Sequence, residues 1–103
     1  MSETIIREGN RATVKPTQRF TASLSEQLKP ELKDLVDQGV AEVIFDLLGV
    51  DDIDSISIGL IVSTHNSLKK LGGVVRVINV CDDIISLFKT MRLDQHFTIQ
   101  GVD

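Results

Sequence analysis

Three carboxylates and two hydroxyls lie within one seven-residue stretch, and an apolar segment follows directly. They are Asp51, Asp52, Asp54, Ser55 and Ser57. If a helix begins here, its unpaired backbone N–H groups can donate to the side-chain oxygen of an Asp or Ser, which is the usual role of these residues at such a position. The same N–H groups and the helix dipole favour a phosphate, so Ser55 is also a candidate for phosphorylation. Chemistry alone favours capping, and the two roles are compatible.

A phosphate on Ser55 would add a charge of about −2 beside three carboxylates. The backbone would tolerate the new group, while its charge would change the surface that a partner meets. This combination suits a switch of protein binding.

The other reactive side chains do not have the spacing of a catalytic or metal site. His65 and His96 lie far apart in the sequence without an evident partner, and Cys81 has the character of a small residue at a strand end. The short acidic loop supplies too few ligands for a cation. Gly72-Gly73 follows a helix and precedes a strand, the reverse of a phosphate-binding loop. We therefore expect neither an enzyme nor a metal or cofactor site.

Length and composition predict a single domain, residues 1–103, with a core of Ile, Leu and Val. The chain has four Phe but no Trp or Tyr, and a net charge of −4. Both features disfavour nucleic acid as a partner, since stacking needs aromatic rings and phosphate backbones attract basic surfaces. A lone cysteine is typical of a reducing compartment, and no apolar run is long enough for a signal peptide or a membrane span. We expect a cytoplasmic protein that does not bind membranes and is monomeric.

Apolar periodicity and the positions of Gly and Pro predict alternating strands and helices. An opening hairpin turns at Gly9-Asn10, and the later strands are separated by helices, which indicates a mostly parallel sheet. We expect an α/β fold with a mixed sheet of about four to five strands and about three to four helices. The predicted strands are residues 4–7, 12–15, 42–47, 74–80 and 97–102; the predicted helices are residues 23–38, 55–71 and 82–92.

The helix predicted over residues 23–38 has both start and stop signals. Ser23 and Glu26 have the spacing of a capping box, and Gly39 fits the position just after the last turn. Pro30 lacks a backbone N–H, so we expect a kink or a later helix start there.

The helix predicted over residues 55–71 is apolar on more than one face in its first two turns. Ile56, Ile58 and Leu60 belong to this part. Such a helix is either deeply buried or contacts a partner on its far side. Gly59 lies within it, where close packing on the sheet or on another chain would explain a residue that weakens helices. A glycine that is simply tolerated in a buried helix is an equal alternative.

Three segments of the chain keep the order and spacing of one family pattern. They are Ile44-Phe45-Asp46-Leu47, Asp54-Ser55-Ile56-Ser57-Ile58-Gly59 and Leu71-Gly72-Gly73-Val74-Val75. They resemble the STAS domain of bacterial anti-sigma factor antagonists, in which an apolar strand ends in Asp-Leu and is followed by Asp-Ser-Ser-Gly-Leu, a helix, Gly-Gly and another apolar strand. The similarity extends from about Ile5 to Ile99 and implies the same fold.

The resemblance implies a partner switch. In such proteins the unphosphorylated form binds an anti-sigma factor, often itself a serine kinase, and phosphorylation of the serine after the motif Asp breaks the complex until a PP2C-type phosphatase restores it. Ser55 matches that serine and Asp54 the motif Asp. Ser57 stands where the motif has Gly and is a weaker candidate for phosphorylation. The loop at residues 18–21 has no acid where the family often carries an Asp.

We therefore expect the partner to contact residues 49–54 and the exposed side of the following helix, with at least one of its apolar side chains exposed. A second interpretation within the same family is a scaffold subunit of a lipid-transport ATPase or of a stress-sensing complex, without phosphorylation. The expected partner-binding residues are Asp52, Asp54, Ser55, Ile56, Ile58 and Gly59.

Overall fold

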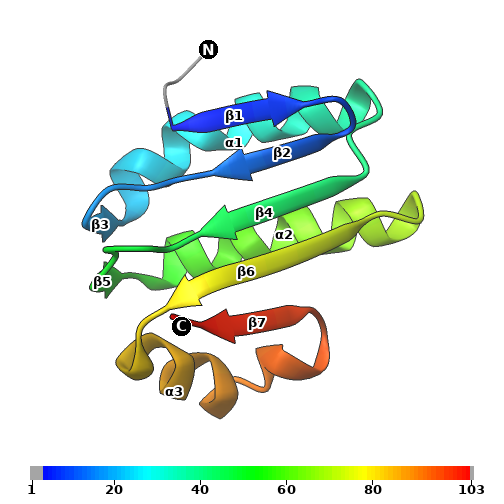
Figure 1. The fold of residues 1–103 in the computed structure, drawn as a ribbon. Coiled ribbons are helices and arrows are strands. Elements are labelled where there is room, and N and C mark those ends of the chain that lie inside the picture. Colours follow the sequence, from blue (N-terminus) through cyan, green and yellow to red (C-terminus); the bar gives the residue numbers. More distant parts are fainter. Residues whose placement is uncertain (1–3, 103) are drawn as a thin grey trace.

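A five-stranded sheet forms one of the two layers of the molecule in a computed structural model that describes residues 4–102. The strand order is β1-β2-β4-β6-β7 (Figure 1). The β1–β2 pair is antiparallel and every other pair in this sheet is parallel, so the expected mixed sheet is confirmed. The strands are β1 (Ile5–Glu8), β2 (Arg11–Val14), β4 (Glu42–Asp46), β6 (Val74–Val80) and β7 (Thr98–Gly101).

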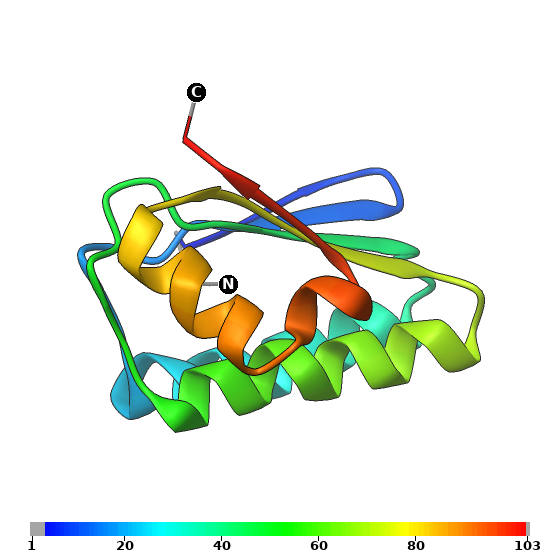
Figure 2. The same cartoon turned by 90° about the horizontal axis from the view of Figure 1, so that it is seen from below.

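Three helices lie on one side of this sheet. They are α1 (Ala22–Asp37), α2 (Ser55–Lys70) and α3 (Asp82–Thr90), and a short 3₁₀ turn, Leu93–Gln95, follows α3. Helices α1 and α2 lie side by side, while α3 packs near β7 at the edge (Figure 2).

The core lies between the helices and the alternate strand residues that face them. Val14, Val43 and Val77 are buried on the sheet, and Leu28 and Ile61 are buried on the helices opposite. The strands alternate because successive side chains point to opposite faces. This single apolar layer holds the two long helices against the sheet.

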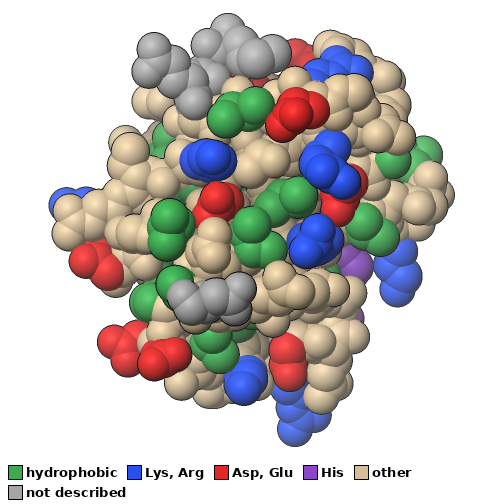
Figure 3. Space-filling model, in the orientation of Figure 1, with side chains coloured by type: hydrophobic (Ala, Val, Ile, Leu, Met, Phe, Trp, Pro, Cys, Tyr) green, Lys and Arg blue, Asp and Glu red, His purple; other side chains and the backbone are tan. Residues whose placement is uncertain are grey.

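The other face of the sheet has no helix over it and carries a mixture of charged and apolar side chains (Figure 3). Glu42 at the start of β4 accepts from Arg11 of β2 at 2.7 Å and lies 3.6 Å from Arg76 of β6. Ile44 lies between Thr13 and Arg76 in the register and is only 7% exposed. Long charged side chains can cover apolar neighbours in this way while keeping their charged ends in water.

The structure corrects two expectations for the first helix, the capping box at Ser23 and the later helix start at Pro30. Helix α1 begins at Ala22 after Thr21, so Ser23 lies inside the first turn and does not cap it. The helix also continues through Pro30, which rules out a later start. Pro30 is exposed, whereas Leu28 and Leu32 on either side of it in the sequence are buried. Their burial offsets the hydrogen bond that proline cannot make.

Helix α2 ends as the sequence predicts, at a pair of glycines. Gly72 has φ of +79°, a conformation that favours glycine, and its N–H donates to Lys69 O at 3.2 Å. The Gly73 N–H donates to Leu68 O at 2.8 Å, which completes a Schellman motif. A Cβ on Gly73 would lie 2.6 Å from the backbone oxygen of Ala41. Gly73 therefore allows the chain to turn closely past β4 into β6.

Gly59 does not pack on the sheet, which was one of the explanations considered for this position. It is exposed in the middle of α2, and a Cβ there would meet no atom within 4 Å. Close packing of this position on the sheet is therefore ruled out.

These two glycines predict opposite responses to the same substitution. Gly73→Ala should destabilise the fold by about 1–3 kcal/mol, because its methyl group would overlap a backbone oxygen. Gly59→Ala should stabilise it by about 0.5–1 kcal/mol, because alanine favours the helix and has open space. Urea unfolding of both variants tests the pair. Equal effects of the two substitutions would contradict this account.

Candidate functional site

The carboxyl ends of β2, β4 and β6 meet at one edge of the sheet, where the loops before α1 and α2 lie side by side (Figure 1). Two short strands, which the sequence analysis missed, join these loops. They are β3 (Arg19–Phe20) and β5 (Asp52–Ile53), and they pair in parallel. Phe20 anchors β3, since it is fully buried and its ring stacks on Phe45 of β4 at 6.2 Å.

Further polar contacts fasten the two loops together. The Asp51 N–H donates to Gln18 O at 3.1 Å, and Arg19 Nε donates to Asp52 Oδ2 at 3.0 Å. The Gln18 side chain donates to Asp51 Oδ2 at 3.2 Å. The expected partner loop, residues 49–54, therefore shares one surface with Gln18 and Arg19, which the sequence analysis did not include.

Asp54 connects the starts of both long helices. It is the N-cap of α2, where Oδ1 accepts from the Ser57 N–H at 2.9 Å. Its other oxygen, Oδ2, accepts from the Ala22 N–H at 2.8 Å, at the first residue of α1. One carboxylate thus satisfies an unpaired N–H at each of two helix N-termini, where negative charge is also favoured.

These bonds explain the direction of the Asp54 pKa. The Ser57 N–H is the largest influence and holds the pKa below the ordinary value of 3.8; partial burial acts in the opposite direction, and the Ala22 N–H lowers the pKa again. Because hydrogen bonds to the ionised form outweigh its loss of hydration, Asp54 is a stable anion at neutral pH.

The two serines after Asp54 have opposite environments. Ser55 is the first residue of α2 and is exposed, and its hydroxyl makes no hydrogen bond within residues 4–102. Ser57 is fully buried, and its hydroxyl lies 2.7 Å from that of Ser25 on α1. The capping role considered for Ser55 belongs to Asp54, and the Ser57 hydroxyl joins two helices inside the protein.

The apolar residues of α2 also divide between surface and core. Ile56 is 54% exposed, whereas Ile58 and Leu60 are only 5% and 6% exposed. Leu48, in the loop after β4, is 61% exposed at the same edge of the sheet. The apolar side chains that a partner can reach here are therefore Ile56 and Leu48 rather than Ile58 or Leu60.

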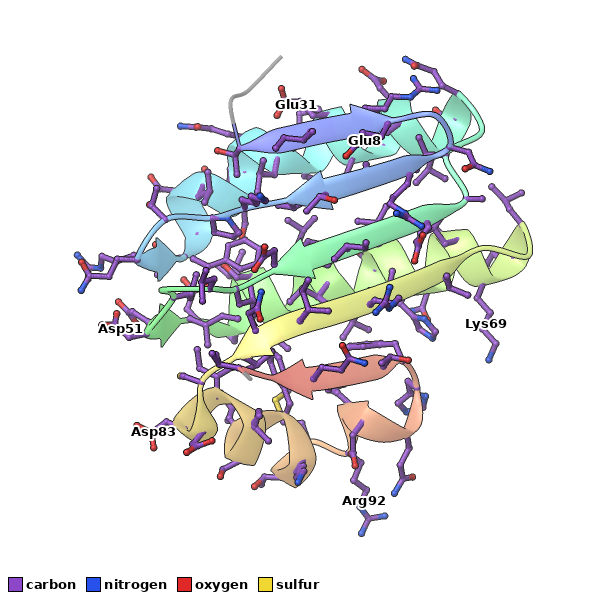
Figure 4. All side chains as sticks on the ribbon, viewed as in Figure 1. Glu8, Glu31, Asp51, Lys69, Asp83 and Arg92 are labelled. Atoms are coloured by element: carbon purple, nitrogen blue, oxygen red, sulfur yellow. The ribbon has the colours of Figure 1, made fainter. Side chains whose placement is uncertain are left out.

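Acidic residues gather at this edge of the sheet. Asp51 and Asp52 precede α2, and Asp82 and Asp83 form the first turn of α3. Asp51 and Asp83 both lie at this end of the molecule (Figure 4). Arg19 is the cation that pairs with this group, through Asp52, and its side chain is 74% exposed.

The two histidines meet at the opposite end of α2, although they are far apart in the sequence. The ring of His65 lies 6.3 Å from that of His96 and 5.3 Å from that of Phe97. Burial lowers the pKa of His65, and the charges of Lys69 and His96 lower it further. Within residues 4–102 no three His, Cys, Asp or Glu side chains are grouped to hold a metal ion, and no helix has the length and apolar character to cross a membrane.

The double role of Asp54 predicts a graded loss of stability on substitution. Asp54→Ala removes both hydrogen bonds and should lower Tm by about 4–8 °C, the shift expected for a lost helix cap in a domain of this size. Asp54→Asn should lower Tm less, since its carbonyl oxygen can still accept from one N–H. Asp34→Asn, at an exposed position of α1, is the matched control and should have no effect.

The same variants predict a pH dependence with a definite sign. Because the folded pKa of Asp54 is depressed, its stabilisation is fully present above the unfolded pKa and is lost as pH falls through the folded pKa. The stability difference between wild type and Asp54→Asn should stay constant from about pH 7 to pH 5 and shrink below about pH 4. Urea unfolding across this range measures it, and a difference that grows at low pH would refute the assignment.

The comparisons with known proteins agree with the fold. The chain matches solved structures of an anti-sigma factor antagonist assigned in Thermotoga maritima (TM-score 0.85, 19% identity, 94% of this chain and 84% of that one) and of a STAS domain protein from Planctomyces limnophilus (0.80, 18%, 96% and 89%). It also matches the anti-sigma factor antagonist SpoIIAA of Bacillus in its unphosphorylated form (0.80, 14%, 95% and 86%). A search of curated proteins finds no match. The family model of the STAS domain matches residues 3–101, so the chain belongs to the STAS domain family.

Proposed function

We propose that this protein is a phosphorylation-switched binding protein of the anti-sigma factor antagonist type, with the Ser55 hydroxyl as the modified group. The observation that carries the proposal is the division of roles at the start of α2. Asp54 takes the capping role and Ser57 is buried, which leaves Ser55 exposed, with no hydrogen bond from its hydroxyl to any of residues 4–102. A kinase can reach this hydroxyl without unfolding the helix.

The comparison with SpoIIAA supports a switch that acts at the surface. This chain matches the unphosphorylated SpoIIAA structure with a TM-score of 0.80 and the phosphorylated one with 0.79. The fold is therefore compatible with both states of that protein. In this chain, too, modification of Ser55 would change charge and shape locally rather than rearrange the core.

The surroundings of Ser55 explain how a phosphate would block binding. Exposed Ile56 is its neighbour, and a partner that binds here would cover that side chain. A phosphate within such an interface adds a charge of about −2 that must lose its hydration, close to Asp51, Asp52 and Asp54. The same group on the free protein stays in water and near the helix N-terminus, so the modification weakens the complex more than the fold.

The partner in this proposal is an anti-sigma factor or a serine kinase, and a PP2C-type phosphatase reverses the modification. The protein then acts by occupancy of a binding surface and not by catalysis, as is general for antagonists of this family. The cytoplasm is where such partners act. The contact surface comprises residues 49–54, Ile56, Leu48 and, through the joined loops, Gln18 and Arg19.

The proposal predicts phosphorylation at a single residue. The chain is incubated with ATP and the anti-sigma factors and serine kinases encoded beside its gene, and the product is mapped by mass spectrometry. Phosphate is expected on Ser55 in the wild type and nowhere in Ser55→Ala. Modification of another residue by the cognate kinase would reject the assignment.

Binding should follow the charge at residue 55. Ser55→Asp should weaken binding to the partner found in that experiment by about tenfold or more, because a charge is then desolvated in the interface. Ser55→Ala should bind as wild type, and Ser86→Asp on the exposed side of α3 serves as the control for added charge. Calorimetry measures the affinities. Equal affinities for all three variants would favour the scaffold interpretation, in which a STAS subunit holds an assembly together without phosphorylation.

A further inference from the structure

A groove between the C-terminal halves of α1 and α2 lies apart from the Ser55 surface and has no role in the proposed switch. Its volume is about 660 Å³, within the range of small-molecule sites. On α2 it extends from Leu60 to Leu71, a length of about 16 Å at the rise of an α-helix. The two helices that form it lie side by side on the covered side of the sheet (Figure 2).

The floor of the groove is apolar and its α2 wall is built from small side chains. Leu32, Val36 and Leu60 form the floor, and Ser63 and Ser67 line the wall. The floor residues are 2%, 9% and 6% exposed, so little of their surface is available to any ligand. Apolar contact along the groove is therefore offered by exposed Pro30 and Leu71 and by the methylene groups of the lysines that line it.

The rim of the groove is positively charged, whereas the protein as a whole is negative. Lys29 and Lys33 of α1 and Lys70 of α2 line it, against one acid, Asp37. The chain carries a net charge of −4. Among residues 4–102, no side chain of these three lysines makes a hydrogen bond or ion pair. Lys69, beside Lys70, lies at the opposite end of the molecule from Asp51 (Figure 4).

We propose that this groove binds a single-chain anionic amphiphile, a long-chain carboxylate, with its chain in the groove and its head group on the lysines. A long apolar hollow with a cationic rim is complementary to both parts of such a molecule. A partner helix is a poorer fit, since few of the lining residues expose a large apolar side chain for it to pack against. The site is independent of Ser55 and of the proposed switch.

Monomeric dodecanoate, kept below its micelle concentration, is the probe that tests this site. Amide chemical shifts of the isotope-labelled chain should move saturably at residues 29–37 and 60–71 and stay unchanged at residues 49–56. Dodecyltrimethylammonium, which has the same chain and the opposite charge, should bind more weakly. Equal binding of the two amphiphiles, or shifts centred on the open face of the sheet, would overturn the proposal.

Substitutions separate the contributions of charge and shape. Lys33→Ala with Lys70→Ala should weaken dodecanoate binding about three- to tenfold, the effect of two exposed ion pairs, while Lys15→Ala with Lys89→Ala should leave it unchanged. Ser67→Phe should fill the groove and abolish binding, with Ser86→Phe on α3 as its control. These positions are all exposed, and Tm verifies that each variant is folded.

Two further measurements test whether another kind of ligand occupies the groove and whether the groove is independent of Ser55. Binding to anionic vesicles or to an acidic amphipathic peptide without binding of monomeric dodecanoate would replace the proposal by a membrane or protein surface. Ser55→Ala should bind dodecanoate as wild type does. Failure of the phosphorylation experiment would therefore leave this site intact, and the absence of a groove ligand would leave the switch intact.

Discussion

The structure depends most directly on one carboxylate that serves two helices. Asp54 accepts from the N–H of Ser57 in α2 and from the N–H of Ala22 in α1. Both helix starts would otherwise leave these donors facing a partly buried space, which costs free energy. The buried hydroxyl pair of Ser25 and Ser57 lies one turn further in and joins the same two helices. The N-terminal ends of α1 and α2 are thereby held together by polar bonds and not only by apolar packing.

The position of Ser55 follows from this arrangement. Serine and aspartate are favoured at the N-cap of a helix, and in α2 Asp54 occupies that position. Ser55 therefore keeps an exposed hydroxyl at a site where the backbone favours an anion. The pairing of β3 with β5 brings a second loop to the same surface, so a partner would meet residues from before both helices.

Helix α2 has two ends of different character. Its N-terminal end lies among aspartates at the carboxyl ends of the parallel strands, where α/β folds commonly place their binding sites. Its C-terminal half lies beside lysines and forms one wall of an apolar groove. The hydrogen bonds that join α1 to α2 lie at the N-terminal end of α2, and the groove lies along its C-terminal half. In the two proposals, one short domain thus offers two separate surfaces to ligands of different chemistry.

The sequence by itself determined the α/β class, the five strands of the main sheet and the stop of α2 at Gly72-Gly73, because apolar periodicity and glycine geometry act over a few neighbouring residues. It also singled out Asp54 and Ser55, and local chemistry could not decide which of them caps the helix. Only the tertiary structure decided that question, because the second partner of Asp54, Ala22, is 32 residues away. The burial of Ser57 and Ile58, the unbroken α1 at Pro30 and the groove likewise depend on where other elements pack. Periodicity identifies the apolar side of a helix, but which polar atoms meet across two helices is set by their relative position in three dimensions.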